Sequence, residues 1–514
     1  MKNIQKLGLA LFIVGLFIFS WIPFLGDYQL DDQIVGKVVK SAHQQVMLEI
    51  LEPMYGKKYG SNFSFIRDFN GFFNAYNQEL KDRQAWDDVI WDNYAFSVTK
   101  ASAISSVQHH PYWFMGISIL LSVLGSLLYI IPMYKSEPEG IKNNGIFFSS
   151  MKSRGLLGII TGTYLILFYV ILYWFPEYMV NLVIMVDPIS KALSGNEASQ
   201  WFLYGLIYTL AILVMGIRMF RKYKGNAYQT LRTASVMFFQ LAFAFLLPEI
   251  LVLFNMPWHD FKNIWPLDYS FFYDYRIDGM VSSGALGMFM LVWGIVLIII
   301  GVPVLTYFYG KRWYCSWVCG CGGLAETLGD PYRQLSDKSL KSWKVERYLI
   351  HGVLAFAVVM TLLTILNYFM KFDLLGQATN QLHTVYGFAI GSAFAGVIGT
   401  GFYPLMGNRV WCRFGCPLAA YLGIVQRFKS RFRITTNGGQ CISCGNCSTY
   451  CEMGIDVRWY AQRGQNIVRS SCVGCGICSA VCPRGVLKLE NADEDGRIND
   501  LPIIIGHKSI SVKS

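Results

Sequence analysis

The chain has 514 residues, of which 54% are hydrophobic and 15% are charged, and its mean hydropathy is +0.36. A soluble protein of this length would carry about 25% charged residues, so the composition excludes a soluble globular chain and indicates an integral membrane protein. The net charge of +11 alone could suggest a nucleic-acid partner, but its uneven distribution along the chain argues against nucleic acid.

Eight apolar stretches are each close to the ~20 residues that an α-helix needs to cross a hydrocarbon core of ~30 Å. They predict membrane-spanning helices over residues 7–25, 112–134, 155–175, 201–220, 233–256, 284–308, 348–370 and 385–408. The first stretch follows Lys2 and Lys6, as in a signal peptide, but it is long and no small-residue cleavage site stands out after it. We therefore expect residues 1–25 to be a retained membrane anchor.

Basic residues gather on one side of this eight-span arrangement. Residues 218–232 carry five basic residues and no acidic one, and residues 409–433 carry six and none. The segments on the other side are acidic: residues 26–110 hold eight basic and eleven acidic residues, and residues 257–283 hold two and four. The positive-inside rule therefore places both termini in the cytoplasm. Segment 26–110 is predicted to be extracytoplasmic and mostly helical, and residues 111–283 to hold transmembrane helices two to five.

Glu249, in the fifth predicted span, is a candidate catalytic residue. A carboxylate inside a membrane span is a functional candidate, and quinol oxidation needs a proton acceptor. The alternative is an interfacial glutamate that reaches the lipid headgroups. Four histidines at the predicted outer ends of spans could form a quinone or haem environment, or be ordinary interface residues: His109, His110, His259 and His383.

All thirteen cysteines lie at or after Cys315, on the predicted cytoplasmic side. That compartment is reducing, so dense cysteines there favour a metal site over disulfides.

A first cysteine repeat has an offset of 97 residues. The stretch GKRWYCSWVCG (310–320) aligns with GNRVWCRFGCP (407–417), which pairs Cys315 with Cys412 and Cys319 with Cys416. Each copy follows a predicted span, so residues 284–433 are predicted to be a duplicated transmembrane unit of helix plus C-x3-C.

On a helix, positions i and i+4 share a face, so two C-x3-C pairs could converge into one four-thiolate site. That site could hold a third iron–sulfur cluster or Cu(I), or act as a redox dithiol. The alternative is that the four cysteines pack as small hydrophobic residues. Cys321 is an extra thiol without an assigned role.

A second repeat has an offset of 31 residues. CISCGNCSTYC (441–451) and CVGCGICSAVC (472–482) are two C-x2-C-x2-C-x3-C runs, the spacing of bacterial two-cluster ferredoxins, in which the fourth cysteine of each run ligates the other cluster. We predict one [4Fe-4S] cluster on Cys441, Cys444, Cys447 and Cys482. We predict a second on Cys472, Cys475, Cys478 and Cys451.

Zinc also takes four thiolates, but it rarely uses such a shared octet. Pro483 follows Cys482 as the ferredoxin pattern expects, whereas Glu452 follows Cys451, a departure expected to affect local geometry and not ligation. The predicted fold is therefore an all-α polytopic membrane bundle of about eight transmembrane helices. A small C-terminal α+β two-cluster ferredoxin-like domain over residues 434–490 and a tail over residues 491–514 follow it.

Residues 284–490 resemble the membrane polyferredoxins of nitrate and nitrous oxide respiration, the NapH and NosR type. WCRFGCPLAAYLG (411–423) fits their C-x3-C-P motif well, whereas YCSWVCGCGG (314–323) has Gly320 in place of the proline and Cys321 in addition. The resemblance implies a protein of the bacterial inner membrane that moves electrons between quinol, its clusters and other subunits of a membrane redox complex.

Other functions stay open beside this one. Related polyferredoxins of the FixG kind imply an assembly factor that reduces or handles copper, and a membrane redox sensor or, more weakly, a transporter would also use such a chain. NosR-type proteins carry an outer flavin domain, and KASAISS (100–106) resembles the end of its attachment motif. Ala103 stands at the threonine position of that motif, so we do not expect covalent flavin.

Overall fold

A computed structural model describes residues 3–133, 153–371, 375–376, 378–437 and 440–491. Within these residues the chain is mostly helical, and eight helical stretches are long and apolar enough to cross a membrane, which confirms the predicted fold class. Their bounds are Asn3–Phe24, Pro111–Ile130, Leu156–Trp174, Gln200–Lys222, Ala227–Leu253, Gly284–Tyr309, Leu340–Phe369 and Ala378–Gly401. Apart from residue 491, the predicted tail lies outside the described residues.

The bounds of the last two spans differ from the predicted ones. The seventh begins eight residues early, at Leu340, because the Ser339 hydroxyl accepts a hydrogen bond from the Ser342 amide and caps the helix ahead of the apolar stretch. The eighth ends at Gly401, since a separate short helix, α22 (Tyr403–Met406), follows, and Gly407 then takes a positive φ of 94°.

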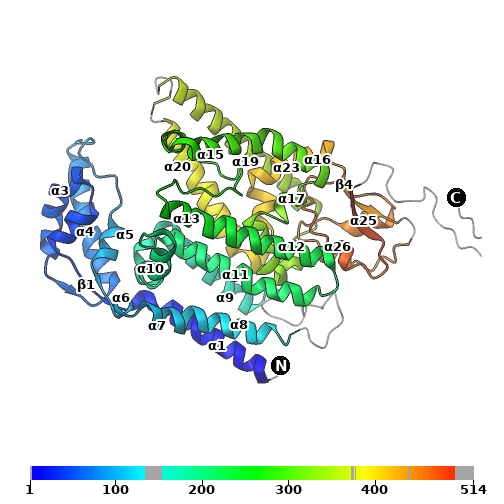
Figure 1. The fold of residues 1–514 in the computed structure, drawn as a ribbon, viewed down its shortest axis with the longest axis horizontal. Helices are drawn as coiled ribbons and strands as arrows, with labels where there is room; N and C mark the ends of the chain where they lie inside the picture. Colours follow the sequence, from blue (N-terminus) through cyan, green and yellow to red (C-terminus); the bar gives the residue numbers. More distant parts are fainter. Residues whose placement is uncertain (1–2, 134–152, 372–374, 377, 438–439, 492–514) are drawn as a thin grey trace, which may run out of the picture. The chain divides into compact units, whose positions relative to one another are not determined.

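The described part of the chain divides into two compact units, the first of which comprises residues 3–133 and 170–207. In this unit α7 (Pro111–Met115), a π-helical turn, η3 (Gly116–Leu120), and α8 (Leu121–Ile130) follow one another along the chain. Helix α1 (Asn3–Trp21) lies along α8 and η3 (Figure 1). A Cβ atom at Gly125 would lie 2.5 Å from the Phe12 backbone nitrogen, so small residues permit this close helix contact.

The predicted helical segment 26–110 also contains a small sheet. Its helices are α2 (Asp32–Val38), α3 (Ser41–Leu51), α4 (Asn62–Asp82), α5 (Ala95–Ala101) and α6 (Ser106–His109). The segment also contains a sheet of antiparallel strands in the order β2-β1-β3, with β1 (Asp27–Gln29), β2 (Lys58–Tyr59) and β3 (Ala103–Ile104). Strands of two or three residues are too short to show a period of two, so the sequence did not indicate them.

A further helix of the first unit, α10 (Val180–Ser194), was not predicted. It is largely buried, and Asp187 accepts from the Lys100 Nζ of α5 at 3.0 Å. With 15 residues, including Asp187, Pro188 and Lys191, it lacks the length and apolarity of a span.

The second unit comprises the described residues within 153–169 and 208–491, and α9 (Leu156–Trp174) and α11 (Gln200–Lys222) contribute residues to both units. Three of its four other membrane spans contain a π-helical stretch between α-helical ones, and α19 is α-helical throughout. They are α12 (Ala227–Phe238), η5 (Phe239–Leu246) and α13 (Leu247–Leu253); α15 (Gly284–Val296), η6 (Leu297–Gly301) and α16 (Val302–Tyr309); α19 (Leu340–Phe369); and α20 (Ala378–Tyr386), η8 (Gly387–Ile398) and α21 (Gly399–Gly401). A short helix, α14 (Asp274–Ser282), precedes α15.

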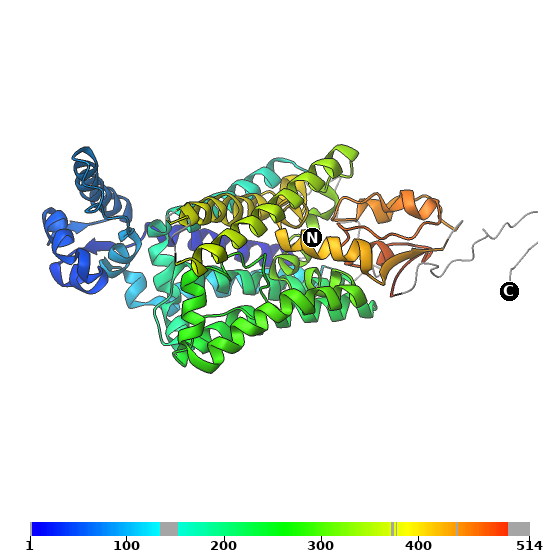
Figure 2. The ribbon, with the colours of Figure 1, turned by 90° about the horizontal axis from the view of Figure 1, so that it is seen from above.

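The C-terminal domain of this unit follows α23 (Pro417–Lys429), as Figure 2 shows in orange and red. Strands β4 (Phe432–Thr436) and β5 (Leu487–Asn491) pair antiparallel, and three short helices lie between them: α24 (Asn446–Thr449), α25 (Val457–Gln462) and α26 (Ile477–Ala480). The domain is thus small and α+β, as predicted.

The 31-residue repeat is visible in the backbone of this domain. Positive φ angles recur in register: 58° at Ser443 and 63° at Gly474, and 79° at Gly445 and 75° at Gly476. The two glycines precede α24 and α26, two helices of four residues each. Because few residues other than glycine adopt this conformation readily, the glycines allow the same tight turn in both copies.

Candidate metal centres

The first ferredoxin-type set of cysteines lines one pocket. Its sulfurs come from the loop before α24, from α24 itself and from the turn after α26, and the pocket also contacts the apolar side chains of Pro483 and Leu487. The members are Cys441, Cys444, Cys447 and Cys482. The structure therefore brings the fourth cysteine of the second run to the first three of the first run.

The second set shows the reciprocal exchange. Cys478 interacts electrostatically with Cys475, Cys472 and Cys451, and Cys472 interacts with Cys451 as well. Cys478 also interacts with Cys447, a member of the first set, so the two sets are neighbours. This crossed arrangement is the one that the spacing predicts.

The surroundings of both sets fit iron–sulfur clusters. Burial raises the pKa of Cys447 and of Cys472 to about 11, and backbone amides of Ser448 and Gly474 partly offset that effect. Amides that donate to sulfur in an otherwise apolar setting stabilise the thiolates that a cluster requires.

The C-x3-C pairs lie in another pocket, which the side chains of Tyr314 and Trp411 help to enclose. The expectation that each pair shares one face of a helix is wrong. Each pair spans a break between two helices: Cys315 ends α17 (Arg312–Cys315) and Cys319 precedes α18 (Gly320–Thr327). In the second copy, Cys412 lies in the π-helical turn η9 (Trp411–Gly415) and Cys416 precedes α23. The four thiols nevertheless line one pocket.

Cys321 is a fifth thiol of this pocket, and it forms a hydrogen bond with Cys319. Gly320 stands where the second copy has a proline, and a Cβ atom there would lie 2.7 Å from Gln240 Oε1. The departure of the first copy from the C-x3-C-P pattern thus reflects close packing of α18 against a membrane helix.

Side chains of the membrane part hold the loop that carries Cys472 and Cys475. Tyr228 donates to the Gly474 carbonyl at 2.7 Å and Gln229 donates to the Cys475 carbonyl at 2.8 Å, both from α12. From the other side, Gln426 of α23 donates to the Cys472 carbonyl at 2.8 Å. Lys311 Nζ donates to the Ser470 carbonyl at 2.9 Å. These side-chain hydrogen bonds to backbone carbonyls therefore attach the loop with Cys472 and Cys475 to the membrane part of the chain.

A buried ionic network lies beside this loop. Glu326 of α18 has three guanidinium partners: Arg232 Nη1 at 2.6 Å, Arg333 Nη2 at 2.9 Å and Arg409 Nη2 at 2.6 Å. Glu452 shares two of them, with Arg333 Nη1 at 2.9 Å and Arg409 Nη2 at 3.0 Å. Burial alone would raise the pKa of Glu326, but the three guanidiniums hold it well below its usual range. Burial raises the pKa of Glu452.

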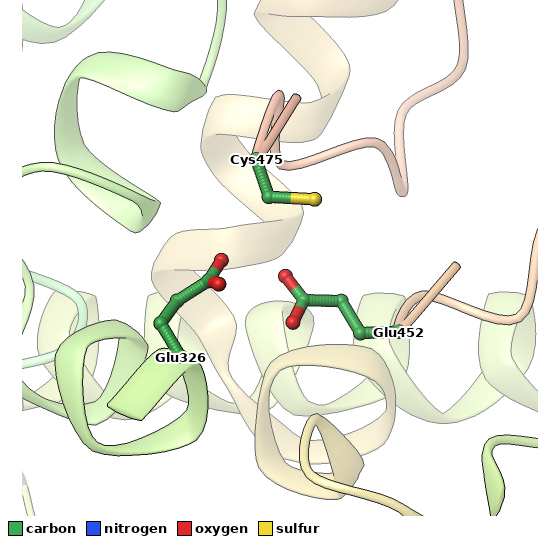
Figure 3. Close-up of side chains that lie close together, drawn as sticks. All are labelled: Glu326, Glu452 and Cys475. Atoms are coloured by element: carbon green, nitrogen blue, oxygen red, sulfur yellow. The ribbon is translucent and has the colours of Figure 1, made fainter. Parts of the chain in front are cut away.

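The carboxylates of Glu326 and Glu452 face each other, with the Cys475 sulfur beside them (Figure 3). One ligand atom of each lies within 4.8 Å of the others. Because arginines occupy both carboxylates, these atoms form part of an ion-pair network, and Cys475 belongs to the second ferredoxin-type set. Glu452 therefore links the ferredoxin-like domain to the membrane part, a role that sequence reasoning missed. The departure from proline after Cys451 was its one signal.

The candidates from the predicted outer side differ in their surroundings. Glu249 is half-buried in α13, and His109 and His110 are exposed in the first unit. His259 is buried against Phe261, and His383 stacks on Tyr273 and lies 2.8 Å from Thr364 Oγ1, so the last two are packed among aromatic or polar neighbours.

Sequence reasoning also missed a groove between α19, α23 and α25. Trp343 and His351 of α19 line it together with Trp459 of α25. Arg347 and Arg469 lie 5.1 Å and 4.9 Å from the Trp343 ring. Gly454, three residues after Cys451, and Ser470, two residues before Cys472, also line this groove. The groove is therefore aromatic and basic, and chain segments close to Cys451 and Cys472 in sequence contribute to it.

Two family matches fall on these cysteines. The family described as "4Fe-4S binding domain" matches residues 291–339 and 387–435, each with one C-x3-C pair. The family described as "4Fe-4S dicluster domain" matches residues 440–487, which hold all eight ferredoxin-type cysteines.

Curated relatives share part of the chain. The chain is 28% identical over 168 residues to the "Putative electron transport protein YccM" of Escherichia coli (strain K12), which covers 29% of this chain and 43% of that protein. It is 27% identical over 160 residues to the "Methylamine utilization ferredoxin-type protein MauN" of Methylobacillus flagellatus, which covers 30% of this chain and 53% of that protein. The chain thus spans about half the length of these relatives or less. No solved structure matches it.

The chain therefore carries 4Fe-4S binding domains, as predicted, and it is distantly related to proteins named for electron transport and for ferredoxin-type domains. The finer resemblance to the NapH and NosR type stays a prediction.

Proposed function

We propose that this protein relays electrons between the quinone pool and a respiratory or reductase partner in the bacterial inner membrane. Two [4Fe-4S] clusters on the cytoplasmic side hold the electrons. The observation that carries the proposal is the fixed attachment of the second set of cysteines to the membrane helices by Tyr228, Gln229, Gln426 and Lys311. A ferredoxin domain that only shuttled between soluble partners would not need this attachment.

Eight thiols hold the two clusters: Cys441, Cys444, Cys447 and Cys482 for one, and Cys472, Cys475, Cys478 and Cys451 for the other. When bound, such clusters supply one-electron transfer. The residues of this chain keep the two sets adjacent, bury the thiols of Cys447, Cys472 and Cys478, and donate backbone amides to sulfur. The buried network around Glu326 and Glu452 stabilises the join between ferredoxin-like domain and membrane helices.

Quinol oxidation releases protons, and we place the acceptor at Glu249, the half-buried carboxylate of α13. The groove at Trp343 is the rival position, since it has aromatic walls and is also lined by Gly454 and Ser470, which are close in sequence to Cys451 and Cys472. Separate substitutions of Glu249 and Trp343 distinguish these two quinol positions, because Glu249 belongs to α13 and Trp343 to α19.

The test is EPR spectroscopy of the anaerobically purified full chain as isolated, after dithionite and after a short-chain quinol, with iron, copper and zinc quantified. The proposal expects cluster signals that quinol reduces. Glu249→Gln should slow the quinol step at least ~100-fold, the lower range for a lost proton acceptor, while dithionite still reduces every cluster. Trp343→Ala should leave the rate within a few-fold of wild type; the opposite pattern moves quinol to the groove.

Clusters that dithionite reduces and quinol does not would overturn the quinone link, and zinc in place of iron would overturn the electron-transfer function. The five soft thiols of the C-x3-C pocket favour a copper-handling assembly factor as the second candidate. Stoichiometric copper together with no response to quinol would establish that alternative.

A further inference from the structure

The groove at Trp343 combines positive charge with exposed apolar side chains. It has a volume of about 910 Å³, and two of its lining residues, Leu340 and Phe428, are 73% and 75% exposed. The described residues that line it include one acid, Asp456, and four cations: Lys338, Arg347, Arg427 and Arg469. A site with a cationic part and an apolar part complements an anionic amphiphile.

The four cations have neutral partners. Lys338 and Arg427 donate to backbone carbonyls at 3.0 Å and 2.8 Å, and Arg347 and Arg469 lie over the ring of Trp343. Among the residues that the structure describes, none of the four takes part in an ion pair. A cationic groove without paired carboxylates attracts an anion from solution or from the membrane.

The neighbouring carboxylates are engaged elsewhere. Glu346, the residue before Arg347, pairs with Arg413 at 3.1 Å. Asp456 accepts a hydrogen bond from the Ser448 hydroxyl at 2.6 Å. The charge of the groove therefore stays positive.

Two of the cations also face the second set of cysteines. Lys338 interacts electrostatically with Cys451, and Arg469 with Cys472. Arg347 and Arg427 are exposed side chains of α19 and α23, and they are the cations that an external anion reaches most directly.

Printed contacts connect the three arginines across the groove. Arg347 of α19 and Arg469 of the ferredoxin-like domain share the Trp343 ring, at 5.1 Å and 4.9 Å. Arg427 of α23 donates to the carbonyl of Val468, the residue before Arg469. Three segments that are distant in the sequence thus bring guanidinium groups to one site.

The position of the groove along α19 is that of a lipid headgroup. Arg347 lies one residue before the apolar stretch that begins at residue 348, and Trp343 and Trp459 line the same groove. Tryptophan gathers at the membrane–water interface, and basic pockets beside membrane helices on the cytoplasmic side bind anionic headgroups.

We propose that this groove binds a phospholipid with an anionic headgroup. Its phosphate lies at Arg347 and Arg427, and its acyl chains lie against Leu340 and Phe428. The bound lipid contacts both the membrane helices and the ferredoxin-like domain. This site goes beyond the proposed electron relay and does not depend on it.

The test adds phosphatidylglycerol or phosphatidylcholine to the delipidated full chain in neutral detergent and counts bound lipid by native mass spectrometry. Two basic residues at a lipid headgroup are together worth about a 30-fold preference for the anionic lipid. The double variant Arg347→Gln/Arg427→Gln should lose this preference. Lys344→Gln/Lys429→Gln is the matched control, since it removes two exposed charges from the same helices outside the groove and should keep the preference.

Equal binding of the two lipids to the wild-type chain would overturn the inference, and this comparison does not depend on the folding of any variant. Equal loss in the control variant would show diffuse surface attraction in place of a site. Displacement of phosphatidylglycerol by the same concentration of inorganic phosphate would assign the groove to a free anion, and displacement by a short-chain quinol would assign it to quinol. A lipid preference in a chain whose clusters do not respond to quinol would overturn the relay alone.

Discussion

Glu326 is the residue on which the buried network depends, because among the described residues its carboxylate alone pairs with Arg232, Arg333 and Arg409 together. Glu326→Gln should destabilise the chain by about 3–5 kcal/mol, the cost of leaving buried charges without their partner. Thermal unfolding of the detergent-solubilised protein, followed by fluorescence, measures this.

Glu79→Gln is the matched control for Glu326→Gln. Glu79 pairs with Arg83 one helical turn away, with both side chains more than half exposed, so its loss should change stability by less than about 0.5 kcal/mol. Equal effects of the two substitutions would show that the buried network does not stabilise the join between ferredoxin-like domain and membrane helices.

At the scale of an element, the glycines of α18 allow this helix to pack closely against its neighbours. A Cβ atom at Gly322 would overlap the Cys315 carbonyl oxygen, so only glycine lets this helix begin directly beside the turn that carries Cys315. Gly322→Ala should therefore lower the melting temperature and the iron content together, because the helix start and the thiol must move apart.

Gly352→Ala tests that effect against ordinary helix propensity. Gly352 lies within α19 and a Cβ atom there meets nothing within 4 Å, so alanine should be neutral or stabilise by up to about 1 kcal/mol. Loss of iron in Gly352→Ala, or none in Gly322→Ala, would contradict the role given to close packing.

At the scale of the whole molecule, charge asymmetry predicts that segment 26–110 faces the outside and the cysteine-rich domain faces the cytoplasm. This segment has no native cysteine. Asp87→Cys should therefore react with a membrane-impermeant maleimide in intact spheroplasts, whereas the wild-type chain should react only after the membrane is opened. Labelling of wild-type cysteines in intact spheroplasts would reverse the orientation.

The sequence alone determined the eight spans and the two ferredoxin-type runs, because hydrophobic length and cysteine spacing are local properties of the chain. Local sequence periodicity also indicated that segment 26–110 is helical, but it did not indicate the strands of two or three residues there. The helix bounds at Leu340 and Gly401 depended on a serine cap and on a following turn, which hydropathy does not register.

Only the tertiary structure decided which residues that are distant in the sequence become neighbours. The meeting of Cys315 with Cys412, 97 residues apart, follows from packing of two repeats, and the i, i+4 argument for it was wrong because a helix break separates each pair. Glu452 looked like a small departure from a motif and proved to be a buried ion-pair partner of Arg333 and Arg409. Spacing along a chain fixes local geometry, whereas burial and long-range contacts arise only when distant segments pack together.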